Sequence, residues 1–307
     1  MNIVPIAFCF DNNLVFPACV CLSSLMMSAK EDTFYDIFIL HSCEQALNHE
    51  DIDKLPSYYK NCRIQYRTVD NTFDEAFEIR GITTPAYYRL LIPELIPEYD
   101  KVLYSDVDVI FRADLSPYYN VELDDNYFAA VEVCTRLRPD IFEYAKNVIK
   151  IDVEKGYYYS GNLVINSQKI RDDHIIEKFK IHAGKDYLFQ DLDILNIVCN
   201  GKIKPLTPVF CLTNYFYELV VTQREKVELL YTKEEIERIL SIGIVHNNGA
   251  KPWRENCHNM DIWWSCYRQS KFYKEEFTYK FYKNRIYEVE SWTLSKRLKH
   301  LFRYFKK

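Results

Sequence analysis

The chain has 307 residues, enough for one large α/β domain or two small ones. Its formal net charge of -5 argues against a nucleic-acid-binding protein, and no apolar run approaches the roughly 18 residues that span a membrane. The ten cysteines lack zinc-site spacing and the N-terminus lacks the regions of a signal peptide, so we expect free thiols in a reducing cytoplasm.

The first third of the sequence alternates apolar runs with segments of helical spacing. Residues 3–10 predict a strand buried on both faces, and Asp11-Asn12-Asn13 predicts the turn that ends it. We then expect a helix over 14–29, a strand over 35–41, a helix over 45–59 and a strand over 63–69. This order predicts a parallel, doubly wound sheet, in which a nucleotide would meet the carboxyl ends of the strands.

Two aspartates, Asp106 and Asp108, follow the next predicted strand, Lys101–Tyr104, which comes after a helix expected over 87–97. Residues i and i+2 of a regular strand point to the same face, so these carboxylates would repel each other unless a cation lay between them. Divalent Mg²⁺ and Mn²⁺ are commonly held by one or two carboxylates together with substrate phosphates. The pattern favours a metal that bridges the protein to a diphosphate; the simpler alternative is a solvated turn with both acids in water.

The middle of the chain carries an aromatic segment, Tyr157–Tyr159, followed by Ser160 and Gly161. A glycine there would allow close approach of the backbone to a ligand. Further elements are expected as strands over 126–133 and 163–166 and as helices over 168–182 and 189–196. Asp191 and Asp193, in the first turn of that last helix, either belong to a site or only interact favourably with the helix dipole.

A predicted strand over 244–245 leads to His246, a turn that contains Gly249, and then Lys251. Histidine can add a nitrogen ligand to a site for Mn²⁺, and lysine binds phosphate as a point charge. A lone histidine at a strand end is more often structural, but the lysine that follows favours the ligand interpretation.

Residues 295–307 hold six lysines and arginines and no acid, with leucines and phenylalanines interleaved at helical spacing. A basic amphipathic helix of this kind predicts contact with an anionic membrane surface, against the alternatives of a helix packed on its own domain or a frayed tail. We expect one domain over 1–255 and a helical, basic amphipathic extension over 256–307.

Taken together, these segments resemble glycosyltransferase family 8, the retaining sugar-nucleotide transferases that include bacterial lipopolysaccharide galactosyl- and glucosyltransferases and the glycogenins. The resemblance runs from Ile3 to about Trp253 and rests on the order and spacing of the segments. The matching residues are Ala7–Asn12, Tyr87–Leu90, Lys101–Asp108, Ser160–Gly161, Leu163–Asn166, Gln190–Asn196, His246 and Lys251–Trp253.

The resemblance implies an α/β fold of the GT-A type, a Rossmann-like, mostly parallel sheet flanked by helices. It implies a Mn²⁺ site, or one for Mg²⁺, made by Asp106, Asp108 and His246. The donor, UDP-galactose or UDP-glucose, would be held by Ala7, Phe8, Asp11, Asn12, Ser160, Gly161, Gly249 and Lys251. Arg89 and Asp191 would be the catalytic residues beside the sugar.

Three residues depart from the family pattern. Phe10 stands where members often carry an acid, Tyr159 where an asparagine is common, and Leu192 where many have glutamine; the spacing from His246 to Lys251 is also one residue shorter. Since leucine cannot attack an anomeric carbon, a front-face mechanism is favoured, with Asp191 as nucleophile the alternative.

We therefore predict a metal-dependent retaining hexosyltransferase that extends a bacterial cell-surface glycan, on lipopolysaccharide or another glycoconjugate, at the cytoplasmic face of the membrane. One alternative is a catalytically weak sugar-nucleotide-binding module, motivated by the three departures. A metal phosphohydrolase is the other, although such enzymes commonly place the paired acids after the first strand.

Overall fold

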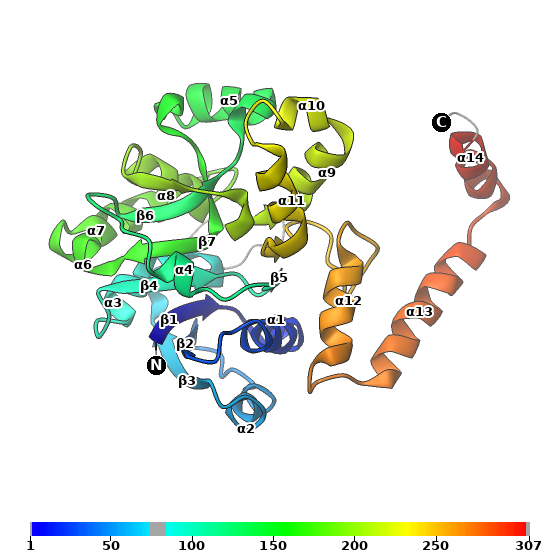
Figure 1. Cartoon of the computed structure of the whole chain (residues 1–307), viewed down its shortest axis with the longest axis horizontal. Coiled ribbons are helices and arrows are strands. Elements are labelled where there is room, and N and C mark those ends of the chain that lie inside the picture. The colour runs from blue at the N-terminus through cyan, green and yellow to red at the C-terminus, as the bar shows by residue number, and fades with distance from the viewer. Residues whose placement is uncertain (1, 74–83, 305–307) are drawn as a thin grey trace.

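The computed structural model describes residues 2–73 and 84–304. Seven strands form one sheet in the order β3-β2-β1-β4-β7-β6-β8 (Figure 1). Neighbouring strands are parallel except at β7, which runs antiparallel to β4 and β6. The bounds are β1 Asn2–Cys9, β2 Thr33–Ser42, β3 Cys62–Val69, β4 Lys101–Ser105, β6 Phe128–Glu132, β7 Tyr158–Asn166 and β8 Ile203–Leu206. The predicted mostly parallel sheet is confirmed.

A second, smaller sheet lies beside the carboxyl end of β4 and has the order β5-β10-β9. Its strands are two residues long: β5 Val109–Ile110, β9 Leu212–Thr213 and β10 Val245–His246. The sequence predicted the strand before His246 but not its two partners, because two-residue strands are too short to show periodicity.

Strand β1 lies inside the sheet, between β2 and β4, which explains why its residues form a continuous apolar run. Ile6 and Phe8 face a core that includes α1, whereas Ala7 and Cys9 face the opposite core, so both faces are buried. Helices α1 (Val15–Met27) and α2 (Leu55–Tyr58) pack on the first face. Helices on the second face are α3 (Ile92–Leu95), α6 (Ser167–Asp172), α7 (Ile175–Ala183) and α8 (Asp191–Val198).

Helix α4 (Ser116–Tyr119) also packs on the first face, against β1 and β4. The remaining helices lie around the small sheet or beyond it. They are α5 (Pro139–Glu143), α9 (Asn214–Thr222), α10 (Arg224–Val227), α11 (Lys233–Ile242), α12 (Met260–Gln269), α13 (Glu275–Glu290) and α14 (Leu294–Tyr304). Helix α12 packs against α1, where the Cys266 thiol donates to the carbonyl of Val20. Phe277 and Phe281 of α13 pack on Trp264 of α12, and from there the rest of α13 and α14 extend away from the sheet (Figure 1). Within the described ranges, no helix combines the length and apolar character needed to cross a membrane.

The helix predicted over 45–59 is wrong for most of its length. A 3₁₀ turn spans Ile52–Lys54 and α2 adds one turn, but residues 45–51 are not helical. The side chain of Asn12 accounts for this, because its Nδ2 donates to the Ala46 carbonyl at 3.0 Å and its Oδ1 accepts from the Asn48 amide at 2.6 Å. These long-range bonds tie the segment to the end of β1 and override its local helical spacing.

Two other predicted helices are interrupted. The segment over 168–182 divides into α6 and α7 at His174, which adopts a left-handed conformation with φ 52°. The segment over 87–97 is a 3₁₀ helix over Thr84–Leu91 followed by α3, which has a proline in its first turn.

Candidate active site

The small sheet brings two distant parts of the chain together. Strand β10 pairs antiparallel with β5, so that His246 lies opposite Val109. Asp108 immediately precedes β5, and its carbonyl accepts hydrogen bonds from the Asn247 backbone amide at 2.9 Å and from Asn247 Nδ2 at 3.1 Å. These contacts fix Asp108 next to His246.

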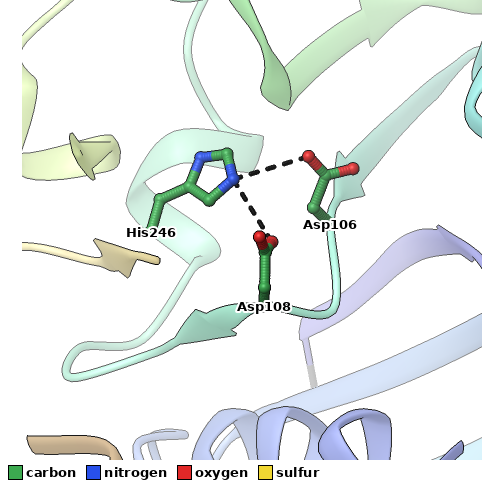
Figure 2. A group of neighbouring side chains, drawn as sticks. All are labelled: Asp106, Asp108 and His246. Atoms are coloured by element: carbon green, nitrogen blue, oxygen red, sulfur yellow. Dashed lines mark ion pairs between the residues drawn. The ribbon is translucent and has the colours of Figure 1, made fainter. Parts of the chain in front are cut away.

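Three side chains from these segments converge (Figure 2). His246 Nε2 lies 3.2 Å from Asp108 Oδ1 and 3.5 Å from Asp106 Oδ2, and the three groups offer ligand atoms within 4.8 Å of one another. Strand β4 ends at Ser105, so the two aspartates lie in the bend between β4 and β5 and not on a regular strand as the i, i+2 argument assumed. Their convergence comes from the bend and from β10.

The chemistry of this cluster fits a divalent cation. Carboxylate oxygens and an imidazole nitrogen are ligands that Mn²⁺ accepts, and Asp108 Oδ1 is buried without a hydrogen bond of ordinary geometry in the described parts of the chain. A Cβ added to Gly161 would lie 2.3 Å from His246 Cε1 and 2.7 Å from Asp106 Oδ2. Because Gly161 has no side chain, the side chains of Asp106 and His246 have room to approach Asp108.

Positive groups surround Asp108. Lys251 Nζ forms an ion pair with Asp108 Oδ2 and donates to the Asn247 carbonyl at 2.9 Å. Burial acts to raise the pKa of Asp108, but Lys251 and then His246 hold it well below its ordinary value. Gly249, in the turn that leads to Lys251, adopts a left-handed φ of +103°, which glycine tolerates best.

Arg89 links the cluster of Asp106, Asp108 and His246 to a further carboxylate. Its Nη2 donates to Asp106 Oδ1 at 2.9 Å, its Nη1 donates to the Ser160 carbonyl at 2.8 Å, and its Nε lies 3.3 Å from Asp191 Oδ2. The guanidinium is 4.5 Å from the centre of the Tyr104 ring. Burial acts to lower the pKa of Arg89, but Asp106 and Asp191 raise it overall, so the residue is a fixed cation between two acids.

Asp191 is the first residue of α8 and is joined to this cluster through Arg89. Burial raises its pKa, against the lowering effect of Arg89, and its Oδ2 accepts no hydrogen bond of ordinary geometry within 2–73 and 84–304. The preceding Gln190 has a strained backbone with φ 47° and ψ -117°. Asp193 holds this turn by accepting from the hydroxyls of Tyr144 and Tyr157 and from the Phe189 amide.

Leu192 lies between these two acids in the sequence, and its side chain is partly buried. It packs with a hydrophobic cluster formed by Val133, Ile141, Ala145, Ile149, Ile151 and Tyr157. Tyr159 also packs against this cluster, with its hydroxyl 3.4 Å from Thr213 Oγ1. Both departures from the family pattern are therefore accommodated by packing.

A cavity of about 290 Å³ opens at the carboxyl end of β1 and is lined by Phe10, Asp11 and Asn12, among others. Asp11 accepts from the Asn13 amide at 2.9 Å, and the Asn12 amide is engaged by the 46–48 segment described above. Ala7 and Phe8 lie deeper in β1 and are fully buried, so their side chains belong to the core.

Sequence reasoning missed two groups that contact the cluster. The Tyr104 hydroxyl donates to Asp106 Oδ1 at 2.6 Å, and Cys211 Sγ lies 3.5 Å from His246 Nδ1. Tyr104 could have been suspected from its place two residues before Asp106. Cys211 carries no such signal, because it reaches the site through the pairing of β9 with β10.

Comparisons with known proteins identify the family of this chain. A model of the family described as glycosyl transferase family 8 matches residues 5–257. General stress protein A of Bacillus subtilis is 25% identical over 264 residues, which cover 83% of this chain and 89% of that protein. A lipopolysaccharide 1,2-glucosyltransferase of Escherichia coli K12 is 26% identical over 193 residues, 61% of this chain and 52% of that protein.

Among solved structures, the galactosyltransferase LgtC in complex with donor and acceptor sugar analogues superimposes with a TM-score of 0.73. The match covers 90% of this chain and all of LgtC, at 23% identity. At this identity the likeness shows the fold, which is of the GT-A type.

Proposed function

Because the chain belongs to glycosyl transferase family 8, we propose that it is a metal-dependent retaining enzyme that moves galactose or glucose from a UDP-sugar to a glycan acceptor. The observation that carries the proposal is the convergence of Asp106, Asp108 and His246. Lys251 lies on one side of this cluster and Arg89, paired with Asp191, on the other. In this arrangement the side with Lys251 would bind the diphosphate of the donor, and the side with Arg89 and Asp191 would bind its sugar.

At the diphosphate end, Lys251 reaches the cluster from a tight turn and can contact a phosphate oxygen as a point charge. A bound Mn²⁺ or Mg²⁺ would hold the diphosphate and offset the charge that builds on departing UDP. The uridine would extend toward the cavity beside Asp11 and Asn12. Since the Asn12 amide already secures the 46–48 segment, we propose that it shapes this pocket more than it contacts the base.

At the sugar end, Asp191 Oδ2 is buried, accepts no hydrogen bond of ordinary geometry from the described residues, and lies 3.3 Å from Arg89 Nε. We propose that this carboxylate accepts a hydrogen bond from a donor-sugar hydroxyl once the donor is bound, with Arg89, which also contacts Ser160, holding it in position. In the front-face reaction the acceptor oxygen bonds to the anomeric carbon on the side from which UDP leaves, and the acceptor proton passes to the departing phosphate. Leu192 supports this route, because its apolar side chain carries no group that could attack the anomeric carbon and packs in a hydrophobic cluster. Asp191 as a nucleophile is the alternative.

The decisive test is UDP release from a panel of UDP-sugars with Mn²⁺ or with EDTA. We expect metal-dependent release from one hexose donor, and an Asp108→Asn variant that folds but loses at least about 100-fold in activity, since even outer-shell changes at metal sites cost about 10–100-fold. The matched control is Asp186→Asn at an exposed position. Normal transfer by Asp108→Asn would remove the metal-site assignment.

A catalytically weak sugar-nucleotide-binding module is the second candidate, and the apolar residues Phe10 and Leu192 favour it. The same assay separates the two proposals. Tight UDP binding without release from any donor, even when acceptor glycans are added, would support the binding module.

We further propose that the C-terminal helices bring the enzyme to the cytoplasmic face of the membrane, where glycolipid acceptors are assembled. Helix α14 carries basic residues together with exposed apolar side chains, and α13 also exposes tyrosines and aliphatic residues. The exposed apolar side chains of the two helices are Tyr279, Tyr282, Ile286, Tyr287, Val289, Leu294, Leu298, Leu301 and Phe302. The E. coli relative named as a lipopolysaccharide glucosyltransferase supports a cell-surface glycan as the acceptor.

Co-sedimentation with vesicles that contain phosphatidylglycerol tests this association. Reversing Lys296, Lys299 and Arg303 to glutamate should weaken vesicle binding by at least about 100-fold, since each basic residue lost near an anionic surface removes about 1 kcal/mol and each added glutamate is repelled. The matched control reverses three exposed lysines elsewhere, namely Lys178, Lys185 and Lys233. Equal loss in both triple variants would mean that net charge, and not α14, governs binding.

A further inference from the structure

Cys211 lies directly behind the imidazole of His246. Its Sγ is 3.5 Å from Nδ1, while Nε2 on the other edge of the ring faces the carboxylates of Asp106 and Asp108. We propose that Cys211 is a positioning residue for the metal site: it accepts a hydrogen bond from Nδ1–H and holds His246 in the tautomer whose Nε2 lone pair is free. This inference rests on the metal site of the proposed function.

The tautomer argument follows from the chemistry of imidazole. A neutral ring carries one N–H and one lone pair, on different nitrogens. If Nε2 is to coordinate a cation, the proton must sit on Nδ1, where a buried N–H requires an acceptor. Metal-ligating histidines usually donate this proton to a carboxylate, a backbone carbonyl or water. Here a sulfur atom takes that place.

The backbone around Cys211 holds the sulfur in position. The Cys211 amide donates to the Pro208 carbonyl at 3.1 Å, and the next amide, of Leu212, donates to the Ile244 carbonyl at 2.7 Å. Leu212 and Thr213 then pair with Val245 and His246 in the small sheet. The sheet that sets His246 against Asp108 therefore also sets Cys211 against His246.

A purely structural role is the competing explanation, since buried cysteines commonly act as small hydrophobic residues. Cys211 is 1% exposed and belongs to the core beneath α1. In that case removal of Sγ would lower stability without affecting the affinity for a metal. The two explanations differ in one measurable quantity, the dissociation constant for Mn²⁺.

The experiment measures Mn²⁺ binding to the full chain by isothermal titration calorimetry, without a nucleotide sugar, for the wild type and three variants. Cys211→Ala should raise the Kd by about 10–100-fold, the usual cost of losing an outer-shell partner. Cys211→Ser, which retains an acceptor, should recover most of the affinity. Cys211→Val fills the volume of the thiol but accepts no hydrogen bond, so it should behave like Cys211→Ala even if the alanine variant folds poorly.

Controls distinguish failure of this inference from failure of the proposed function. Cys199→Ala truncates a cysteine that is equally buried but lies in the core on the other face of the sheet, and its Kd should not change. If Asp108→Asn loses Mn²⁺ binding but Cys211→Val binds like the wild type, the metal site stands and the role of Cys211 is refuted. A wild-type protein that binds no Mn²⁺ would refute both.

Discussion

The substitution Gly161→Ala should displace the side chains of the proposed metal site. The added Cβ would lie 2.3 Å from His246 Cε1, 2.9 Å from His246 Nδ1 and 2.7 Å from Asp106 Oδ2. Carbon atoms in contact are normally about 3.5–4.0 Å apart, so the imidazole would have to move by about 1 Å or more. The backbone at Gly161 lies outside the left-handed region, so the effect would be one of space and not of backbone strain.

The size of this displacement sets the expected loss of Mn²⁺ affinity. Ligand distances at metal sites hold within about 0.2 Å, so a shift of about 1 Å should weaken Mn²⁺ binding by about 100-fold or more. Overpacking should also reduce the free energy of unfolding by about 1–3 kcal/mol. Calorimetry with Mn²⁺ and a thermal melt measure the two effects separately.

Gly184→Ala is the matched control, because a Cβ added at that exposed glycine meets nothing within 4 Å. It should leave both Mn²⁺ affinity and stability nearly unchanged. If Gly161→Ala binds Mn²⁺ as tightly as the wild type, the ligand geometry described here is wrong.

Two further predictions concern buried charges. Arg89→Lys should lower kcat by about 10–100-fold with a smaller change in KM, because one ammonium group cannot hold both Asp106 and Asp191 in place. Each lost hydrogen bond to a charged group is worth about 1.5–3 kcal/mol, and steady-state kinetics would measure kcat and KM separately. Unchanged kcat would mean that Arg89 does not position the acids. Asp36→Asn should destabilise the fold by about 1–2 kcal/mol, because burial acts to raise the Asp36 pKa but hydrogen bonds, led by those from Arg63, lower it overall. A carboxyl group whose pKa is lowered by folding stabilises the fold at pH values above its unfolded pKa of about 4. The difference in urea unfolding should therefore be full at neutral pH, begin to shrink below about pH 4, and vanish only below the lower pKa of the folded state; a constant difference would contradict this.

Part of the candidate site could be predicted because its residues follow buried strands. Asp106 comes directly after β4 and His246 is the last residue of β10, and the apolar runs before them are visible in the sequence. In an open α/β sheet, ligands bind outside the carboxyl ends of the strands, so the sequence could place Asp106 there. The approach of Asp108 to His246 depends on the bend after β4 and on the pairing of β5 with β10. The contacts of Asn12 and Cys211 were not predictable in this way, because each depends on a segment more than 30 residues away.

The sequence by itself determined the fold class, the family and which acids and histidine are available for a metal, since these depend on periodicity and on the order of motifs. The tertiary structure decided how those groups are presented. The bend after β4, the two-residue strands β5, β9 and β10, and the packing of Leu192 into a hydrophobic cluster all arise from contacts between distant segments. Local sequence carries no record of such contacts, because a two-residue strand or a side-chain bridge is stabilised by its partner and not by its own neighbours.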